Sequence, residues 1–281
     1  MGTEGPAGEK MMPKNPDCAC PRDCPRHGDC EACITFHKTR PNPPDCMRVK
    51  RRPAPRGTGR CLLVAGGPSG DRAGVELKAA PGDLVIACDA GYPAALQLGL
   101  KPALAVGDFD SYGGEIAPDV EVVRTPVRKD DTDTMTGLRL GLSRGCRDFV
   151  IVGALGGRLD HTVANLQALC WLCTQGARGV ILSADNRAWA VRDGALELPR
   201  MEGWYLSVFA AGECEGVTLR GVEYPLTGAR LSPSMPIGVS NEFSADTARI
   251  EVARGTLIVI ASRREARDTE KNETAPAGAA E

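Results

Sequence analysis

The sequence predicts an α/β domain built on a parallel sheet, followed by a smaller domain made only of β-strands. Two observations predict this arrangement. Between residues 61 and 185, short apolar runs that end in Gly or Asp alternate with helical segments, a pattern typical of parallel strands buried on both faces. After Asp185 the helical period disappears, and short alternating runs punctuated by Gly and Pro favour an antiparallel sandwich or barrel.

Six apolar runs are the expected strands of the parallel sheet: CLLVAGG, LVIACDAG, ALAVGDFDS, VEVVRT, FVIVGALGG and GVILSAD. Between them, apolar residues recur at helical spacing in DTDTMTGLRLGLSRG and in DHTVANLQALCWLCTQG. The second segment contains Cys170 and Cys173 on its apolar face, so we interpret both as packing residues rather than as a metal or redox pair. The expected strands of the second domain are RAWAVR, ALELP, WYLSVFA, GVTLRGV, ARIEVA and TLIVIA.

Size and composition restrict the class of protein. The chain has 281 residues and 42% hydrophobic content, enough for two modest cores. A net charge of -2 gives no electrostatic reason for a nucleic-acid or acidic-membrane partner, and 4% aromatic content disfavours a base-stacking surface. No apolar run approaches the ~20 residues of a membrane-spanning helix. The opening stretch MGTEGPAGEKMMPKNP lacks the apolar segment of a secretory signal, so we expect a cytoplasmic protein.

Half of the twelve cysteines lie in one short segment, residues 17–47, together with two histidines. A reducing compartment disfavours disulfides, and thiolate and imidazole ligands at these spacings favour tetrahedral Zn²⁺. The segment offers eight candidate ligands where one zinc ion needs four, and free or redox-sensing thiols are the alternative. The eight candidates are Cys18, Cys20, Cys24, His27, Cys30, Cys33, His37 and Cys46.

The complete expected organisation has five parts. A Cys/His-rich zinc module (17–47) and a basic flexible linker (48–60) precede the α/β domain (61–185). The β-rich domain (186–262) and a polar, disordered tail (263–281) follow it.

Acidic residues gather where the predicted strands end. Asp89 closes one strand, Asp108 and Asp110 close the next, and Asp130 with Asp133 opens the following helix. An open parallel sheet binds ligands beyond the carboxyl ends of its strands. Carboxylate oxygens suit Mg²⁺, which bridges to substrate phosphates.

Phosphate-binding groups lie in the same loops. The glycines of GALGGR, Arg158 and the helix N-terminus at Asp160 can bind phosphate, and Lys129 and Ser111 add two further donors. Together with Mg²⁺ these groups indicate phosphoryl or pyrophosphoryl transfer.

Each of these residues also has an ordinary structural interpretation. Asp130 or Asp160 alone could be a helix N-cap, Asp89 and Asp108 could belong to common turns, and His161 could be a packed residue. Neither GxxxxGK[ST] nor GxGxxG occurs, so the two commonest nucleotide-binding motifs do not support the hypothesis. The combination of several acidic loops favours the catalytic interpretation.

Five segments together resemble the thiamine pyrophosphokinase (thiamine diphosphokinase) family. They are CDAGYPAALQLGLKPALAVGDFDS, KDDTDTMTGLRLGL, GALGGRLDHTVANLQAL, GVEYPL and GVSNEF, in the order of the family, and the resemblance covers residues 61–261. It implies that the thiamine hydroxyl attacks the β-phosphorus of MgATP, giving thiamine diphosphate and AMP. It also implies a Rossmann-like catalytic domain, a β-rich thiamine-binding domain and a homodimer with thiamine at the interface.

The resemblance carries roles onto individual residues. It implies that Asp108, Asp110 and Asp130 hold Mg²⁺ and the ATP phosphates, and that Asp133 and Asp160 complete the acidic catalytic cluster. Residues expected near ATP are Asp89, Ser111, Lys129, Thr132, Arg158 and His161. Ser240 and Asn241, in SNEF, would hold the thiamine pyrimidine, although SN alone is also typical of a turn.

Some assignments stay open in the sequence. The acceptor of the hydroxyl proton is not singled out among the carboxylates, and Trp189, Trp204 and Tyr224 are equal candidates for an aromatic partner of the cationic ligand. Asp131 departs from the family, in which many members have an apolar or aromatic residue, and we expect it to add only exposed charge.

Two other functions compete with this one. A pyrophosphokinase for another hydroxymethyl heterocycle, such as a pterin, could use a similar GDFDS motif, but SNEF in a β-domain argues against it. A thiamine or nucleotide sensor without turnover could signal through the Cys/His module, but the set of aspartates is complete. The module itself resembles Cys/His segments at the ends of uncharacterised bacterial proteins, and we expect a regulatory or partner-binding role for it.

Overall fold

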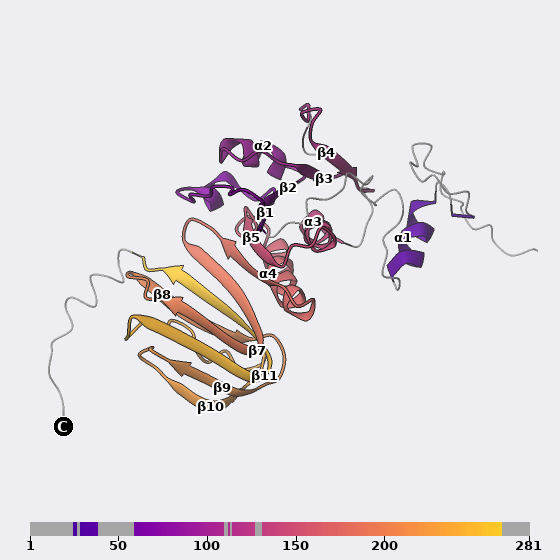
Figure 1. The fold of residues 1–281 in the computed structure, drawn as a ribbon. Coiled ribbons are helices and arrows are strands. Elements are labelled where there is room, and N and C mark those ends of the chain that lie inside the picture. The colour runs from indigo at the N-terminus through magenta and orange to yellow at the C-terminus, as the bar shows by residue number, and fades with distance from the viewer. Residues whose placement is uncertain are drawn as a thin grey trace, which may run out of the picture.

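Figure 1 shows the computed structural model of the chain, which describes residues 25–26, 29–38, 59–109, 112, 114–126 and 131–265. Most of the predicted zinc ligands therefore lie outside the described residues, namely Cys18, Cys20, Cys24, His27 and Cys46. The same is true of four predicted site residues, Asp110, Ser111, Lys129 and Asp130. The one helix described before residue 59 is α1, Cys30–Lys38.

The α/β part is an open parallel sheet in the order β6-β5-β1-β2-β3-β4. Its strands are β1 (Cys61–Val64), β2 (Leu84–Cys88), β3 (Leu104–Gly107), β4 (Glu121–Arg124), β5 (Asp148–Val152) and β6 (Arg178–Leu182). Four further elements connect them: the 3-10 helix η2 (Ser69–Arg72), α2 (Gly91–Gln97), α3 (Asp133–Ser143) and α4 (Leu159–Thr174). All six strands coincide with the apolar runs that predicted them.

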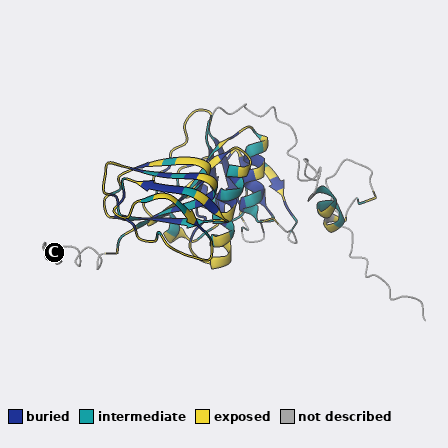
Figure 2. Cartoon of the chain, turned by 90° about the horizontal axis from the view of Figure 1, so that it is seen from below, coloured by how far each residue is buried: buried dark blue, intermediate teal, exposed yellow. Residues whose placement is uncertain are grey.

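Helices cover both faces of this sheet. Because side chains alternate along a strand, Cys61 and Leu63 of β1 face the core under α3 and α4, whereas Leu62 and Val64 face the core under α2. Figure 1 shows α2 and the α3–α4 pair on opposite sides of the sheet. The buried residues of Figure 2 follow the strands accordingly. Burial on both faces is therefore the reason that these strands are continuously apolar.

The β-rich part continues the same sheet. Its strands are β7 (Asn186–Pro199), β8 (Trp204–Ala210), β9 (Cys214–Arg220), β10 (Leu226–Leu231) and β11 (Thr247–Arg263). Strand β7 pairs antiparallel with β6, so hydrogen bonding runs without a break through eleven strands. Strands β8 and β9 both pair with β11, β8 near its end and β9 near its beginning, so the sheet forks there. A third core lies among β7 to β11.

The structure confirms the predicted fold class of an α/β region followed by antiparallel strands, while the domain boundary after residue 185 stays a prediction. Two details differ from the sequence prediction. RAWAVR and ALELP form one long strand, β7, and ARIEVA and TLIVIA form β11, whose pairing passes through an irregularity between Val252 and Thr256. Strand β10 and helix α2 were not predicted at all.

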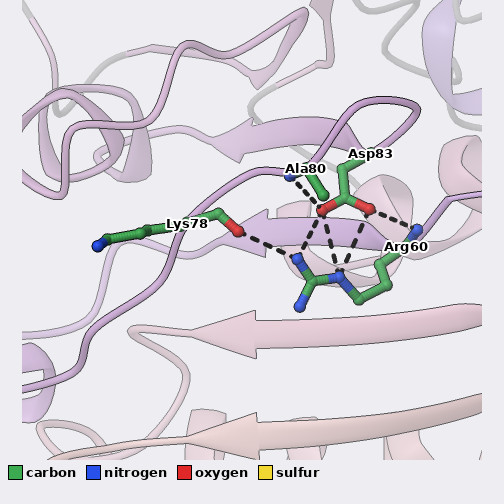
Figure 3. A network of polar contacts seen from close by, with 4 residues as sticks. All are labelled: Arg60, Lys78, Ala80 and Asp83. Carbon is green, nitrogen blue, oxygen red and sulfur yellow. Dashed lines mark hydrogen bonds and ion pairs between the residues drawn. The ribbon is translucent and has the colours of Figure 1, made fainter.

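A partly buried ion pair joins Arg60, directly before β1, to Asp83 in the turn before β2 (Figure 3). The Asp83 side chain is only 3% exposed and accepts hydrogen bonds from the Arg60 guanidinium and from the main-chain N–H groups of Arg60 and Ala80. Arg60 also donates to the carbonyl oxygen of Lys78. Burial alone would raise the pKa of Asp83, but these hydrogen bonds lower it below its ordinary value. The contact lies at the N-terminal ends of β1 and β2. Asp89 and Asp108 lie at the opposite, C-terminal ends of the strands.

Among the described residues, no helix has the length and apolar character that a membrane span requires.

Candidate active site

Gly107, the last residue of β3, is the point at which the acidic loops meet. A Cβ atom at this position would lie only 3.1 Å from both Cα and Cβ of Asp89. The main-chain N–H of Asp89 donates to the carbonyl oxygen of Val106 at 2.8 Å. Because glycine permits this approach, Asp89 after β2 and Asp108 after β3 lie beside each other at the C-terminal edge of the sheet.

Thr125 brings a third carboxylate to the same place. Its N–H donates to the carbonyl oxygen of Gly107 at 3.0 Å, and its hydroxyl donates to Oδ1 of Asp133 at 3.1 Å. Asp133 is the first residue of α3, where the helix dipole favours negative charge. Asp89, Asp108 and Asp133, all half-buried, thus lie at one corner of the sheet, Asp89 and Asp108 at the predicted ends of β2 and β3 and Asp133 at the start of α3.

Backbone strain concentrates in the predicted site. Four residues other than glycine have positive φ in the described part of the chain: Asp89 (49°), Phe109 (58°), Asp193 (45°) and Ser240 (58°). Such conformations are uncommon and gather at binding and catalytic positions. Three of the four belong to the motifs CDAG, GDFDS and SNEF, so the strain marks both halves of the predicted site.

Thr132 caps helix α3. Its side chain accepts a hydrogen bond from the N–H of Met135 at 3.1 Å, which satisfies one of the free donors of the first turn. Asp131 beside it forms an exposed ion pair with Arg139, in agreement with the expectation that this departure from the family adds only surface charge.

The loop after β5 forms a second part of the site. Arg158 and Asp160 are exposed and form an ion pair at the start of α4, and the hydrogen bond from Arg158 lowers the pKa of Asp160. His161 is also exposed, which does not fit the alternative of a packed histidine. Strands β5 and β3 lie three places apart, so their ends are about 14 Å apart at the usual strand spacing. The Arg158 loop and Asp108 therefore mark two ends of an extended site.

The described residues include only some of the predicted metal ligands. Within them, no three His, Cys, Asp or Glu side chains form a complete metal site, and Asp110 and Asp130 lie outside them. Cys33 and His37 both lie on α1. Burial raises the pKa of the half-buried Cys170 to about 11, so this thiol stays protonated at neutral pH, consistent with a packing role.

The SNEF segment is organised by a buried asparagine. Asn241 is 4% exposed. Its Oδ1 accepts from the N–H groups of Tyr224 and Glu242, and its Nδ2 donates to the carbonyl oxygen of Tyr224. Ser240 is exposed, and its N–H donates to the hydroxyl of Ser207. Asn241 thus holds main chain, whereas Ser240 and the 69% exposed Tyr224 face solvent.

The three candidate aromatic residues differ sharply in exposure. Trp204 is 8% exposed, and the guanidinium groups of Arg187 and Arg263 lie 5.2 and 4.9 Å from its ring. Trp189 packs against the core of the β-rich part. Tyr224, at 69% exposure, therefore has the most accessible ring of the three.

Sequence analysis missed two polar residues behind the loop after β5. Asn165 on α4 is buried and donates to the carbonyl oxygen of Ala154, and Asp71 in η2 accepts from the N–H of Leu155. The sequence contains a signal for Asn165, because this polar residue lies at helical spacing from Leu169 and Leu172 and thus on the apolar face of the helix. It contains none for Asp71, since its partner is 84 positions away.

Comparisons with known proteins agree with this arrangement. Residues 77–181 match the family model described as "Thiamin pyrophosphokinase, catalytic domain", and residues 195–257 match "Thiamin pyrophosphokinase, vitamin B1 binding domain". The chain is 28% identical over 209 residues to the thiamine pyrophosphokinase of Bacillus subtilis (strain 168), covering 71% of this chain and 97% of that one.

Solved structures show the same relationship. The crystal structure of the Bacillus subtilis enzyme matches with a TM-score of 0.68 and 26% identity, over 73% of this chain and 99% of that one. A thiamin pyrophosphokinase family protein from Enterococcus faecalis matches with a TM-score of 0.63 and 30% identity, over 74% of this chain and all of that one.

An open parallel sheet with carboxylates and a glycine loop at its C-terminal edge, continued by antiparallel strands, is an α/β fold with the groups that phosphoryl transfer uses. The two family models and the full-length relatives then specify it further. The chain belongs to the thiamine pyrophosphokinase family.

Proposed function

We propose that this enzyme transfers the pyrophosphoryl group of ATP to the hydroxyl of thiamine at the acidic corner of the sheet. The hydroxyl loses its proton, a bond forms between its oxygen and the β-phosphorus, the bond from that phosphorus to the oxygen of the α-phosphate breaks, and AMP leaves with the electron pair on that oxygen. The convergence of Asp89, Asp108 and Asp133 around Gly107 carries this proposal. It occurs in a chain that matches both the catalytic and the vitamin B1 binding models of one family.

The donor set at this corner fits Mg²⁺. Half-buried carboxylates supply the hard oxygen ligands that this ion prefers, and because the described residues form no complete metal site by themselves, the proposed site also needs Asp110 and Asp130. We propose Asp108, Asp110 and Asp130 as the magnesium ligands, with Asp133 and Asp89 next to them. Bound there, Mg²⁺ neutralises charge on the phosphates.

The loop after β5 is the proposed phosphate site at the other end of the extended nucleotide. Gly156 and Gly157 allow a close main-chain approach, and the sixteen-residue helix α4 begins directly after them. Arg158 is exposed and held by Asp160 beside this helix start. Lys129, Ser111, Thr132 and His161 remain proposed contacts of ATP, Thr132 in addition to its role as a cap.

Thiamine is proposed to bind beside Ser240 and Tyr224. The ring of Tyr224 can stack on the cationic ligand, and Asn241 fixes the main chain of Tyr224 from both sides. We therefore assign Asn241 the positioning of this pocket wall, with Ser240 as the side chain directed to the pyrimidine.

The direct test is incubation of the full-length chain with ATP, Mg²⁺ and thiamine, with AMP and thiamine diphosphate as readouts. We expect both products in equal amounts, and a loss of roughly a thousandfold in kcat for Asp108→Asn because a metal ligand is removed. Asp131→Asn is the matched control, since its carboxylate pairs with Arg139 at the surface. Wild-type rates in Asp108→Asn would refute the metal role. Turnover of a hydroxymethylpterin but not of thiamine would support the rival enzyme.

A second prediction concerns the thiamine pocket. Tyr224→Ala is expected to raise the KM for thiamine about tenfold, the size of a lost cation–π contact, with the KM for MgATP unchanged. Tyr224→Phe keeps the ring and should resemble the wild type. Ser240→Gly removes the hydroxyl without straining the positive φ of this position and should weaken thiamine binding alone. Equal rises in both KM values would contradict this assignment.

We further propose a cytoplasmic homodimer whose Cys/His segment binds zinc and has a regulatory or partner-binding role. Met235, Ile237 and Val239 are 62%, 47% and 51% exposed and lead directly to Ser240, an apolar surface that a second copy would cover. The zinc proposal rests on the ligand chemistry of eight Cys and His residues in one short segment.

Native mass spectrometry of the full-length chain tests both features at once. The expected species contains two chains of 29.7 kDa each with at least one zinc ion per chain. A chain shortened to begin at Gly57 is the control and should keep the dimer while losing zinc. A zinc-free or monomeric full-length protein would contradict the respective part of the proposal.

A further inference from the structure

The proposed phosphate loop after β5 cannot hold its own shape. Gly153, Gly156 and Gly157 all have positive φ, at 69°, 77° and 68°. Glycine is the residue with the greatest backbone freedom, so a segment with three of them needs outside contacts to keep one conformation. The two other residues of the segment, Ala154 and Leu155, are buried at 4% and 8% exposure, and they are where those contacts are made.

The peptide group between Ala154 and Leu155 is clamped from both sides. Its carbonyl oxygen accepts from Nδ2 of Asn165 at 2.7 Å. Its N–H donates to Oδ2 of Asp71 at 3.2 Å. Asn165 comes from α4 and Asp71 from η2, so two distant segments fix the orientation of one peptide plane.

Asp71 is itself anchored to the end of β6. The hydroxyl of Ser183 interacts with its carboxylate and opposes the rise of its pKa, while the same hydroxyl oxygen accepts from the N–H of Asn186 at 2.9 Å. The carbonyl oxygen of Asp71 accepts from the N–H of Ala184 at 2.8 Å. Burial raises the pKa of this half-buried carboxylate. One side chain therefore connects the loops that follow β1, β5 and β6.

The segment before Asp71 also supports the glycines. The N–H of Gly67 donates to the carbonyl oxygen of Gly153 at 2.8 Å. A Cβ atom on Gly156 or Gly157 would lie 3.3 or 3.5 Å from the ring of Pro68. The loop after β1 thus lies directly against the loop after β5.

We propose that Asp71 is a positioning residue for ATP binding: with Asn165 it fixes the 154–155 peptide and thereby the arrangement of the glycine N–H groups and of the first turn of α4. In this role Asp71 acts through the main chain of the loop and not by direct contact with the nucleotide. The inference rests on the proposed function, in which this loop binds the phosphates. The 3-10 helix η2, which lies in none of the sequence motifs, thereby contributes to the affinity for the nucleotide.

The test compares full-length Asp71→Ala, Asp71→Asn and Ser183→Ala with the wild type. For Asp71→Ala we expect the KM for MgATP to rise roughly tenfold or more, the scale of one hydrogen bond to a charged group, with the KM for thiamine unchanged. Asp71→Asn keeps one oxygen for the N–H of Leu155 and should recover most of the loss. Ser183→Ala removes one anchor of the carboxylate and should give a smaller rise.

Hydrogen exchange of the segment 153–158 supplies a readout that does not need turnover. Asp71→Ala should accelerate exchange there. Asp119→Ala is the control, because Asp119 pairs with the exposed Lys101 before β3 and β4, at the opposite edge of the sheet, and should leave exchange and both KM values unchanged. Unchanged exchange in Asp71→Ala, or equal rises of both KM values, would overturn the proposal. If the wild type makes no thiamine diphosphate, the proposed function fails while the exchange data still decide whether the clamp exists.

Discussion

The close contact between Gly107 and Asp89 is the constraint on which the site depends. The neighbouring parallel strands β2 and β3 end at the same level of the sheet. The absence of a side chain at Gly107 lets the main chains that follow them approach each other. The same glycine accepts the hydrogen bond from Thr125, which in turn holds Asp133. Main-chain contacts thereby place Asp89 and Asp108, and the Thr125 hydroxyl holds Asp133, although the three carboxylates carry like charges.

The candidate site contains two kinds of polar side chain: buried amides that hold the main chain, and exposed groups that are open to a ligand. Asn165 and Asn241 are both buried amides inside segments that resemble the family, and both bind main-chain atoms of a neighbouring loop. Ser240, Tyr224 and Arg158 are exposed beside them. The buried asparagines thus hold the main chain of loops whose exposed side chains are proposed to meet the substrates, so a motif residue need not be a ligand.

The parts of the fold and of the candidate site that could be predicted are those that leave a local pattern in the sequence. Strands β1 to β6 were recognisable because burial on both faces makes each run continuously apolar, and their ends located Asp89 and Asp108. Helix α2 was not predicted, because its seven residues include a proline and are too few to show a helical period of apolar residues. Asp130 was predicted to open the next helix, whereas Thr132 is the cap of α3. The contacts of Asp71 and Asn241 depend on the packing of distant loops, which no local pattern records.

The Mg²⁺-dependent turnover of a Gly107→Ala variant tests the role of the contact between Gly107 and Asp89 most directly. A methyl group there would meet main-chain atoms of Asp89 at 3.1 to 3.2 Å and push the two acidic loops apart. We predict that turnover falls at least a hundredfold while the protein stays folded, and that Gly212→Ala, where an added Cβ meets nothing within 4 Å, behaves as the wild type. Turnover of Gly107→Ala at the wild-type rate would contradict the claim that this contact assembles the site.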